Sequence, residues 1–185
     1  MIAIGHVGIT LVVCAPFVNL LVASGHRAEV PGWVGIALLV TLVPDVDLVV
    51  PWITHRGVTH SLLAAGCLGV VVAVVSTTRW GGTPITPDES LRRAIFGFVV
   101  GSGGVISHLL GDLITPMGIR PFFPFDSHYS LNLVYAKDLS ANLTFIAVGI
   151  VTFWTVYLRS KDPLPTDGTT ADELPAESEV HSVNP

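Results

Sequence analysis

Long apolar runs, each close to the length that crosses a bilayer, dominate the first 160 residues of this chain. A membrane-spanning helix needs about 20 mostly apolar residues. Four runs meet this requirement, at about residues 2–24, 61–78, 94–113 and 141–158. A fifth, at about 33–52, is interrupted by Pro44-Asp45-Val46-Asp47, so it is either a full span with a polar end or a shorter, broken helix. Together with a mean hydropathy of +0.67, the pattern predicts an all-α transmembrane bundle of about five spans.

Ionisable residues are concentrated at the junction of the second and third runs, whereas they are scarce in the rest of the apolar region. The residues of this junction are Asp45, Asp47, His55, Arg56 and His60. Carboxylates and imidazoles are costly to hold near hydrocarbon unless they pair or bind a metal. The junction therefore predicts either a metal site or a metal-free network of buried polar groups.

Alternation of the spans across the membrane brings four chain segments to one face. These are the start of the first span, the end of the second, the start of the third and the end of the fourth. The ionisable residues near these points are His6, Asp45, Asp47, His55, His60, His108 and Asp112. Independent placement would scatter such residues over both faces, so we expect a metal site at one membrane face.

The spacing of these residues suits metal coordination. His108 and Asp112 are four residues apart, which places both on one side of a helix as two ligands, or as a ligand and its orienting carboxylate. Gly57 permits a tight turn between His55 and His60, and Thr59 is expected to cap the third helix. Four histidines and three aspartates suit Zn²⁺, with Mn²⁺ as the alternative, bound as one ion or as a pair.

Four motifs resemble the YdjM-like family of predicted membrane-bound metal-dependent hydrolases. They are G-H at 5–6, P-D-x-D at 44–47, H-R-G-x-T-H-S at 55–61, and H-L-L-x-D-x-x-T-x-x-G at 108–118 followed by P-F at 124–125. The resemblance covers residues 3–126 and implies distant kinship with the helical zinc-dependent phospholipase C and P1 nuclease group, which cleaves phosphodiesters. It implies six metal ligands and Asp47 as a further ligand or a base. The six are His6, Asp45, His55, His60, His108 and Asp112.

Together with this resemblance, the site residues lead us to expect a hydrolase that cleaves a phosphoester in a lipid or lipid-linked molecule. Asp47 would accept a proton, and Arg56 would offset charge on the phosphate. For Arg56 the alternative is an ion pair with Asp45 or Asp47. Phe122–Phe125 would shield the site or guide acyl chains. Membrane lipid is the expected partner, and no nucleic acid is expected. The alternatives in function are a metal-handling transporter and a non-catalytic membrane protein with a structural metal.

The net charge of −5 comes from the end of the chain, where six acids and no Lys or Arg follow residue 161. We therefore expect a membrane domain at 1–160 and a disordered acidic tail at 161–185. Cys14 and Cys67 lie inside apolar runs and are expected to be packed and unpaired. His128 lies outside the motifs and is expected to be an exposed loop residue.

Basic residues predict the orientation of the protein in a plasma membrane. With five spans, the face opposite the ligands carries six of them, Arg27, Arg79, Arg92, Arg93, Arg159 and Lys161. The ligand face carries three, Arg56, Arg120 and Lys137. Because short cytoplasmic loops are enriched in Lys and Arg, the ligand face is expected outside the cytoplasm and the acidic tail inside it. The N-terminus lacks the basic region of a signal peptide, so the first run is expected to be retained.

Overall fold

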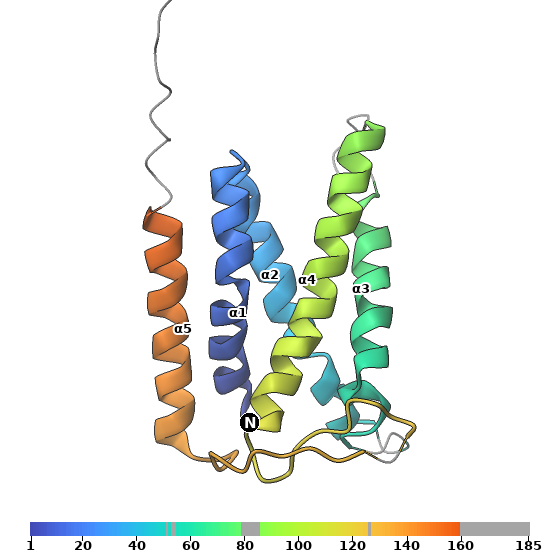
Figure 1. Ribbon diagram of the computed structural model, residues 1–185, viewed down its shortest axis with the longest axis vertical. Coiled ribbons are helices and arrows are strands. Elements are labelled where there is room, and N and C mark those ends of the chain that lie inside the picture. Colours follow the sequence, from blue (N-terminus) through green and yellow to red (C-terminus); the bar gives the residue numbers. More distant parts are fainter. Residues whose placement is uncertain (51, 53–54, 79–85, 126, 160–185) are drawn as a thin grey trace, which may run out of the picture.

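The computed structural model of the protein describes residues 1–50, 52, 55–78, 86–125 and 127–159. Within these residues, five α-helices alternate in direction (Figure 1): α1 (Ala3–Ala23), α2 (Val30–Thr41), α3 (Leu62–Ser76), α4 (Pro87–Leu113) and α5 (Leu139–Arg159). The short 3₁₀ turns η1 (Arg27–Glu29), η2 (Pro44–Leu48) and η3 (Val58–His60) lie between them. The described residues contain no β-strand, so the predicted all-α bundle is confirmed. The predicted tail lies outside these residues and stays a prediction.

In the described part of the chain, four segments are long and apolar enough to cross a membrane. They are α1, residues 27–48, α4 and α5. Helix α3 has 15 residues, which at 1.5 Å per residue gives about 22 Å, less than the roughly 30 Å of a bilayer core. It lies beside the longer α4 (Figure 1). The five expected spans thus correspond to five helices among the described residues; α1, α4 and α5 have full spanning length, and the second span reaches it only with the 3₁₀ turns on either side of α2.

The second apolar run is the shorter, broken helix rather than one continuous helix. Helix α2 ends at Thr41, and the chain continues through the 3₁₀ turn η2 that begins at Pro44. Proline has no backbone N–H and its ring collides with the preceding helical turn, so the α-helix cannot run on. Asp45 and Asp47 therefore lie in a 3₁₀ turn rather than in a regular α-helix. They are at the same end of the bundle as the N-terminus.

Side-chain caps fix where α3 and α4 begin. Ser61 caps α3, because its hydroxyl accepts a hydrogen bond from a backbone N–H of the first turn. The predicted capping by Thr59 is wrong, since that hydroxyl donates to Asp47 instead. Helix α4 begins at Pro87, earlier than the apolar pattern indicates, because Thr86 caps it. Proline is favoured at the first helical position, where its missing N–H has no partner to lose.

Glycines allow the helices to approach closely. A Cβ on Gly8 of α1 would collide with the backbone of Phe145 in α5, and one on Gly149 would collide with the backbone of Gly8. In the second pair of helices, a Cβ on Gly101 of α4 would lie 2.8 Å from the carbonyl oxygen of Leu68 in α3. Close backbone packing is a main source of helix association in lipid, where apolar side chains gain little by leaving the solvent.

Large apolar side chains cover the outside of the bundle, among them Leu39, Val74 and Val151. Such a surface suits lipid rather than water. Both cysteines are unpaired, as expected. Cys67 is nevertheless exposed on α3 rather than packed inside, because α3 contacts the bundle chiefly through α4.

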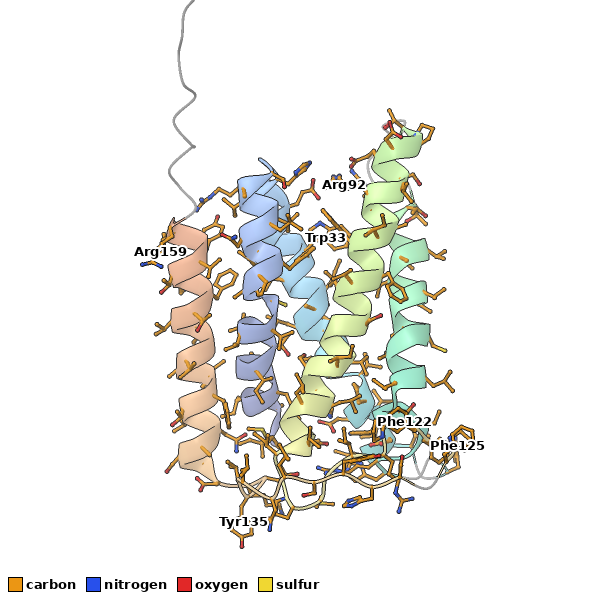
Figure 2. All side chains as sticks on the ribbon, in the orientation of Figure 1. Trp33, Arg92, Phe122, Phe125, Tyr135 and Arg159 are labelled. Atoms are coloured by element: carbon orange, nitrogen blue, oxygen red, sulfur yellow. The ribbon has the colours of Figure 1, made fainter. Side chains whose placement is uncertain are left out.

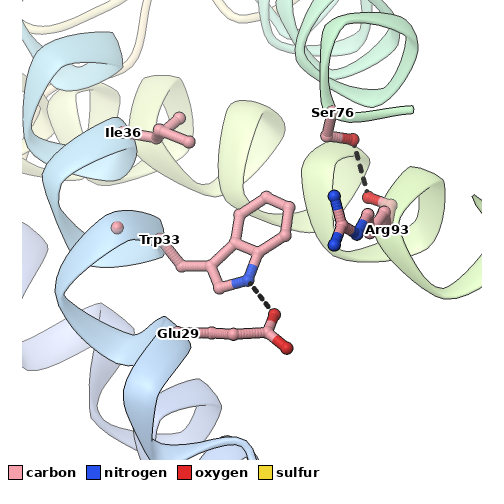
Figure 3. Close-up of a pocket in the computed structure, with 6 residues that line it drawn as sticks. Glu29, Trp33, Ile36, Ser76 and Arg93 are labelled. Carbon is pink, nitrogen blue, oxygen red and sulfur yellow. Dashed lines mark hydrogen bonds between the residues drawn. The ribbon is translucent and has the colours of Figure 1, made fainter. Parts of the chain in front are cut away.

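Ion pairs join α4 to η1 at the end of the bundle opposite the predicted ligands. Arg92 of α4 contacts Glu29 at 2.8 Å and Glu89 at 2.9 Å, and the indole of Trp33 donates to Glu29. A cavity of about 310 Å³ lies beside this network, between Trp33 and Arg93 (Figure 3). Figure 2 shows Arg92 and Arg159 at this end, and Phe122, Phe125 and Tyr135 at the other. None of the predicted metal ligands lies here.

Candidate metal centre

The seven predicted ligand residues lie at one end of the bundle, on or next to four different elements. His6 lies in the first turns of α1, Asp45 and Asp47 in η2, and His55 and His60 around η3. His108 and Asp112 lie near the end of α4. The alternation of helix directions therefore brings together residues that are up to 106 positions apart in the chain.

Five of the seven form two overlapping groups of the kind that could hold a metal ion. One group is His6, His108 and Asp112, and the other is Asp45, His60 and His108. Within each group, one ligand atom per residue lies within 4.8 Å of the others. The three imidazoles are fully buried, and Asp45 is the most exposed member. Because His108 belongs to both groups, the geometry allows one ion or two neighbouring ions.

His60 and His108 direct the same ring nitrogen toward each other. The Nδ1 of His108 lies 2.7 Å from the carbonyl oxygen of Thr41, which can only accept a hydrogen bond. The Nδ1 of His60 lies 3.0 Å from the Thr59 hydroxyl, whose own proton goes to Asp47, and 3.1 Å from the Asp47 carboxylate, so this nitrogen is also a donor. In the neutral rings both Nε2 atoms then carry lone pairs, and these atoms are 3.1 Å apart. Two facing lone pairs need a cation or a shared proton between them.

Carboxylates surround the same point. Asp112 Oδ2 lies 3.4 Å from Nε2 of His60 and 3.7 Å from Nε2 of His108. Asp45 Oδ1 lies 3.8 Å and 3.5 Å from the same two atoms. Ligands of a tetrahedral zinc ion, at about 2.0 to 2.1 Å from the metal, are roughly 3.3 Å from one another. The donor set and its spacing therefore fit a divalent metal bound through N and O.

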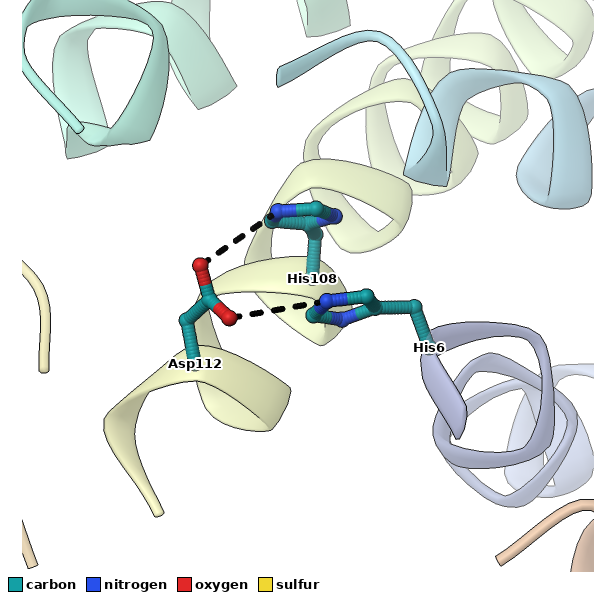
Figure 4. A group of neighbouring side chains, drawn as sticks. All are labelled: His6, His108 and Asp112. Carbon is teal, nitrogen blue, oxygen red and sulfur yellow. Dashed lines mark ion pairs between the residues drawn. The ribbon is translucent and has the colours of Figure 1, made fainter. Parts of the chain in front are cut away.

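The ring nitrogens of His6 are available to bind a metal. Both lack a hydrogen-bond partner although the side chain is fully buried, and Nε2 lies 3.5 Å from Asp112 Oδ1 (Figure 4). The ring stacks on that of His108, with centroids 3.8 Å apart. A buried polar atom without a partner is costly and therefore uncommon. The absence of a side chain on Gly111 makes room for this ring.

Arg56 pairs with a different carboxylate from the two expected. Its Nη2 lies 2.9 Å from Asp112 Oδ1, and its Nη1 donates to the carbonyl oxygen of Gly118 at 2.6 Å. The amino group of Met1 contacts the same oxygen of Asp112 at 2.5 Å. The alternative expected from the sequence, an ion pair with Asp45 or Asp47, is therefore wrong; Arg56 contacts Asp47 through its backbone N–H, which donates to the carboxylate. The guanidinium therefore lies directly beside the metal-ligand cluster.

Asp47 and His55 lie next to the two groups rather than in them. The two oxygens of Asp47 accept from the Thr59 hydroxyl and the Arg56 backbone, and contact Nδ1 of both His55 and His60. This buried carboxylate thus fixes two imidazoles at once. His55 is about one-third exposed, with its Nδ1 2.8 Å from Asp47. Their predicted roles as ligands stay predictions, and the geometry favours a positioning role for Asp47.

Replacing Asp47 by asparagine should weaken metal binding by about 10- to 100-fold, as is typical when a group that orients a ligand is lost. The amide lacks the charge that holds the Nδ1–H of His60 and fixes the lone pair on Nε2. Isothermal titration of zinc into the purified protein would measure this change. Asp88→Asn, at the opposite end of α4, should leave the affinity unaltered, and equal losses in both variants would contradict the assignment.

Three contributors to the site have no signature in the sequence. Thr41 acts through its backbone carbonyl, and its hydroxyl joins those of Thr10 and Ser107 in a buried group that links α1, α2 and α4. Hydroxyls inside apolar helices are common, so nothing distinguishes these three from ordinary helix contacts. Helix packing places these three residues next to His108, whose Nδ1 contacts the carbonyl oxygen of Thr41.

The comparisons with known proteins agree with this architecture. The YdjM inner membrane protein family matches residues 1–164 of the chain. The inner membrane protein YdjM of Escherichia coli (strain K12) is 26% identical over 180 residues, covering 88% of this chain and 85% of that protein. The Shigella flexneri protein of the same name shows the same values. No solved structure gives a significant match. With most of its length matched, the chain belongs to the YdjM inner membrane protein family.

Proposed function

We propose that this protein is a membrane-bound, metal-dependent hydrolase that cleaves a phosphoester in a lipid or lipid-linked molecule. The observation that carries the proposal is the pair of Nε2 atoms of His60 and His108, 3.1 Å apart and flanked by Asp45 and Asp112. Zn²⁺ suits these ligands best, with Mn²⁺ as the second choice. When bound, such an ion would lower the pKa of a water and polarise a phosphoryl oxygen.

Arg56 supplies the positive charge for the phosphate in this proposal. Its guanidinium contacts Asp112, yet its Nε has no hydrogen-bond partner although the atom is buried. A guanidinium presents several N–H groups in a planar fork, so it can contact a carboxylate and a phosphate oxygen together. The left-handed backbone of Arg56, with φ of 61°, aims the side chain back toward the cluster.

His55 is a better candidate than Asp47 to accept a proton from water, and Asp47 contacts the other ring nitrogen of His55. The two oxygens of Asp47 are already engaged by four groups, so this carboxylate has little capacity for a proton from water. His55 is partly exposed, and its Nδ1 is held by Asp47, which leaves Nε2 to accept. A carboxylate behind an imidazole fixes the ring and stabilises its protonated form. Asp47 is then a positioning residue.

The proposal is tested by assaying purified protein in lipid nanodiscs against short-chain phosphoesters. Dioctanoylphosphatidic acid and dioctanoylphosphatidylglycerol, with zinc or manganese supplied, would cover the monoester and diester classes. We expect hydrolysis that a chelator abolishes and zinc or manganese restores. Arg56→Gln should retain the metal but lose at least about 100-fold in rate, as expected for a group that stabilises developing charge. Stoichiometric metal without turnover of any phosphoester would favour a structural metal instead.

The cluster should face away from the cytoplasm, since the alternation of spans predicted from the sequence assigns six basic residues to the other face and three to this one. After replacement of Cys14 and Cys67, Tyr135→Cys should react with a membrane-impermeant thiol reagent in intact cells. Asp88→Cys, which is exposed at the start of α4, should react only after lysis. The reverse pattern would place the cluster on the cytoplasmic side and its substrate in the inner leaflet.

A further inference from the structure

Two cavities share one wall, and the first of them adjoins the cluster. The first, of about 210 Å³, is lined by His55, Arg56, Met117, Gly118, Ile119, Arg120 and His128. The second, of about 390 Å³, is lined by Leu113, Ile119, Pro121, Phe122, Tyr129, Ser130 and Leu131. Ile119 lines both. The first cavity is polar and basic, and the second is almost wholly apolar. Together they match the polar and the apolar part of an amphiphilic ligand.

The basic cavity has the charge to hold an anion. Its described lining contains two arginines, two histidines and no carboxylate. Arg56 is partly neutralised by Asp112, but Arg120 is exposed and forms no ion pair with any carboxylate among the described residues. His128 is exposed, as expected, and its Nε2 donates to the carbonyl oxygen of Met117 at 2.9 Å, which holds the ring at the wall. A phosphate is the natural partner of such donors.

The backbone around the shared wall is well defined. Ile119 and Tyr129 exchange backbone hydrogen bonds of 2.9 and 3.0 Å, which tie the two sides of the loop together. Gly118 adopts a left-handed φ of 58°, and a Cβ there would collide with the carbonyl oxygen of Tyr129. The carbonyl oxygen of Gly118 accepts from Arg56. This one segment therefore links the cavities to the guanidinium beside the metal ligands.

We infer that the two cavities form the binding site for an anionic phospholipid, whose headgroup phosphate lies in the basic cavity between Arg56 and Arg120, beside His128. One acyl chain lies over the apolar cavity against Phe122 and Leu131. The inference rests on the proposed function and adds a substrate class to it, namely lipids whose polar end carries uncompensated negative charge. Arg120 is then a specificity-determining residue that contacts the phosphate together with Arg56, which lies beside the metal ligands.

Binding without turnover tests the inference. The probe is a phosphonate analogue of dioctanoylphosphatidic acid, whose C–P bond resists hydrolysis, titrated into the full-length protein in detergent micelles. We expect Arg120→Gln to raise the Kd about tenfold, the loss of one charge-assisted contact, while the metal content stays constant. The matched control is Arg159→Gln, at the other end of the bundle, which should leave the Kd unchanged.

Several results would overturn the inference. These are an unchanged Kd in Arg120→Gln, equal binding of uncharged dioctanoylglycerol, and displacement of the probe by inorganic phosphate at the same concentration as by the lipid. Hydrolysis by the wild-type protein with an unaffected Kd in Arg120→Gln would contradict this inference alone. Arg120-dependent binding with no hydrolysis of any phosphoester would support it while contradicting the proposed hydrolase.

Discussion

Replacing His60 by alanine should abolish stoichiometric binding of a divalent metal. His60 supplies one of the two facing Nε2 atoms and belongs to the group with Asp45 and His108. Loss of an orienting partner alone costs about 10- to 100-fold in metal affinity, so loss of the ligand itself should cost more than about 100-fold. Metal analysis of the folded protein after gel filtration, by plasma mass spectrometry, gives the measurement. Asp112→Ala should give the same result.

His26→Ala is the matched control for this prediction. His26 precedes η1 at the opposite end of the bundle, so its removal should leave the metal content unchanged. Helical content from circular dichroism must be equal in the three proteins, since an unfolded variant would also lack metal. Full metal content in both His60→Ala and Asp112→Ala would show that the cluster is a metal-free polar network.

Replacing Gly8 by leucine should separate α5 from α1 or unfold the protein. Even a Cβ at this position would collide with the backbone of Phe145, which cannot move aside as a flexible side chain can. Overpacking typically costs 1 to 3 kcal/mol, and a backbone collision belongs at about 3 kcal/mol or above. Denaturation in SDS, followed by circular dichroism, would measure the loss of unfolding free energy.

Gly103→Leu provides the comparison for this variant. It introduces the same side chain into α4, where a Cβ at Gly103 meets no atom within 4 Å. Its effect should stay within about 0.5 kcal/mol, as for most surface changes. If the two variants were equally stable, close contact of α1 and α5 through Gly8 would not be a source of stability.

The amino-acid sequence by itself determined the class of fold and the end of the bundle where the site lies. Apolar runs of spanning length leave helices as the only backbone that satisfies its own hydrogen bonds in lipid, and short connections force neighbouring helices to alternate. Alternation then places the start of α1, the region before α3 and the end of α4 together. This is why His6, His60, His108 and Asp112 could be assigned to one site from their positions in the chain.

The tertiary structure decided the individual roles within that site. The pairing of Arg56 with Asp112 rather than Asp45 or Asp47 depends on the left-handed turn at Arg56 and on where α4 ends. The engagement of Asp47 by two imidazoles depends on the 3₁₀ geometry of η2. These contacts join residues whose spacing along the chain carries no periodic signal, so only packing could reveal them.

The same limit applies to the shortened helices and to the cavities. Hydropathy reports which residues avoid water, but it does not report where Pro44 ends a helix or that α3 stops at 15 residues. Arg120 and His128 belong to a loop without hydrophobic periodicity, and they reach Arg56 only because the bridge between Ile119 and Tyr129 folds that loop under the bundle. Local pattern specifies the helices, whereas contacts between distant segments specify the chemistry that the site can perform.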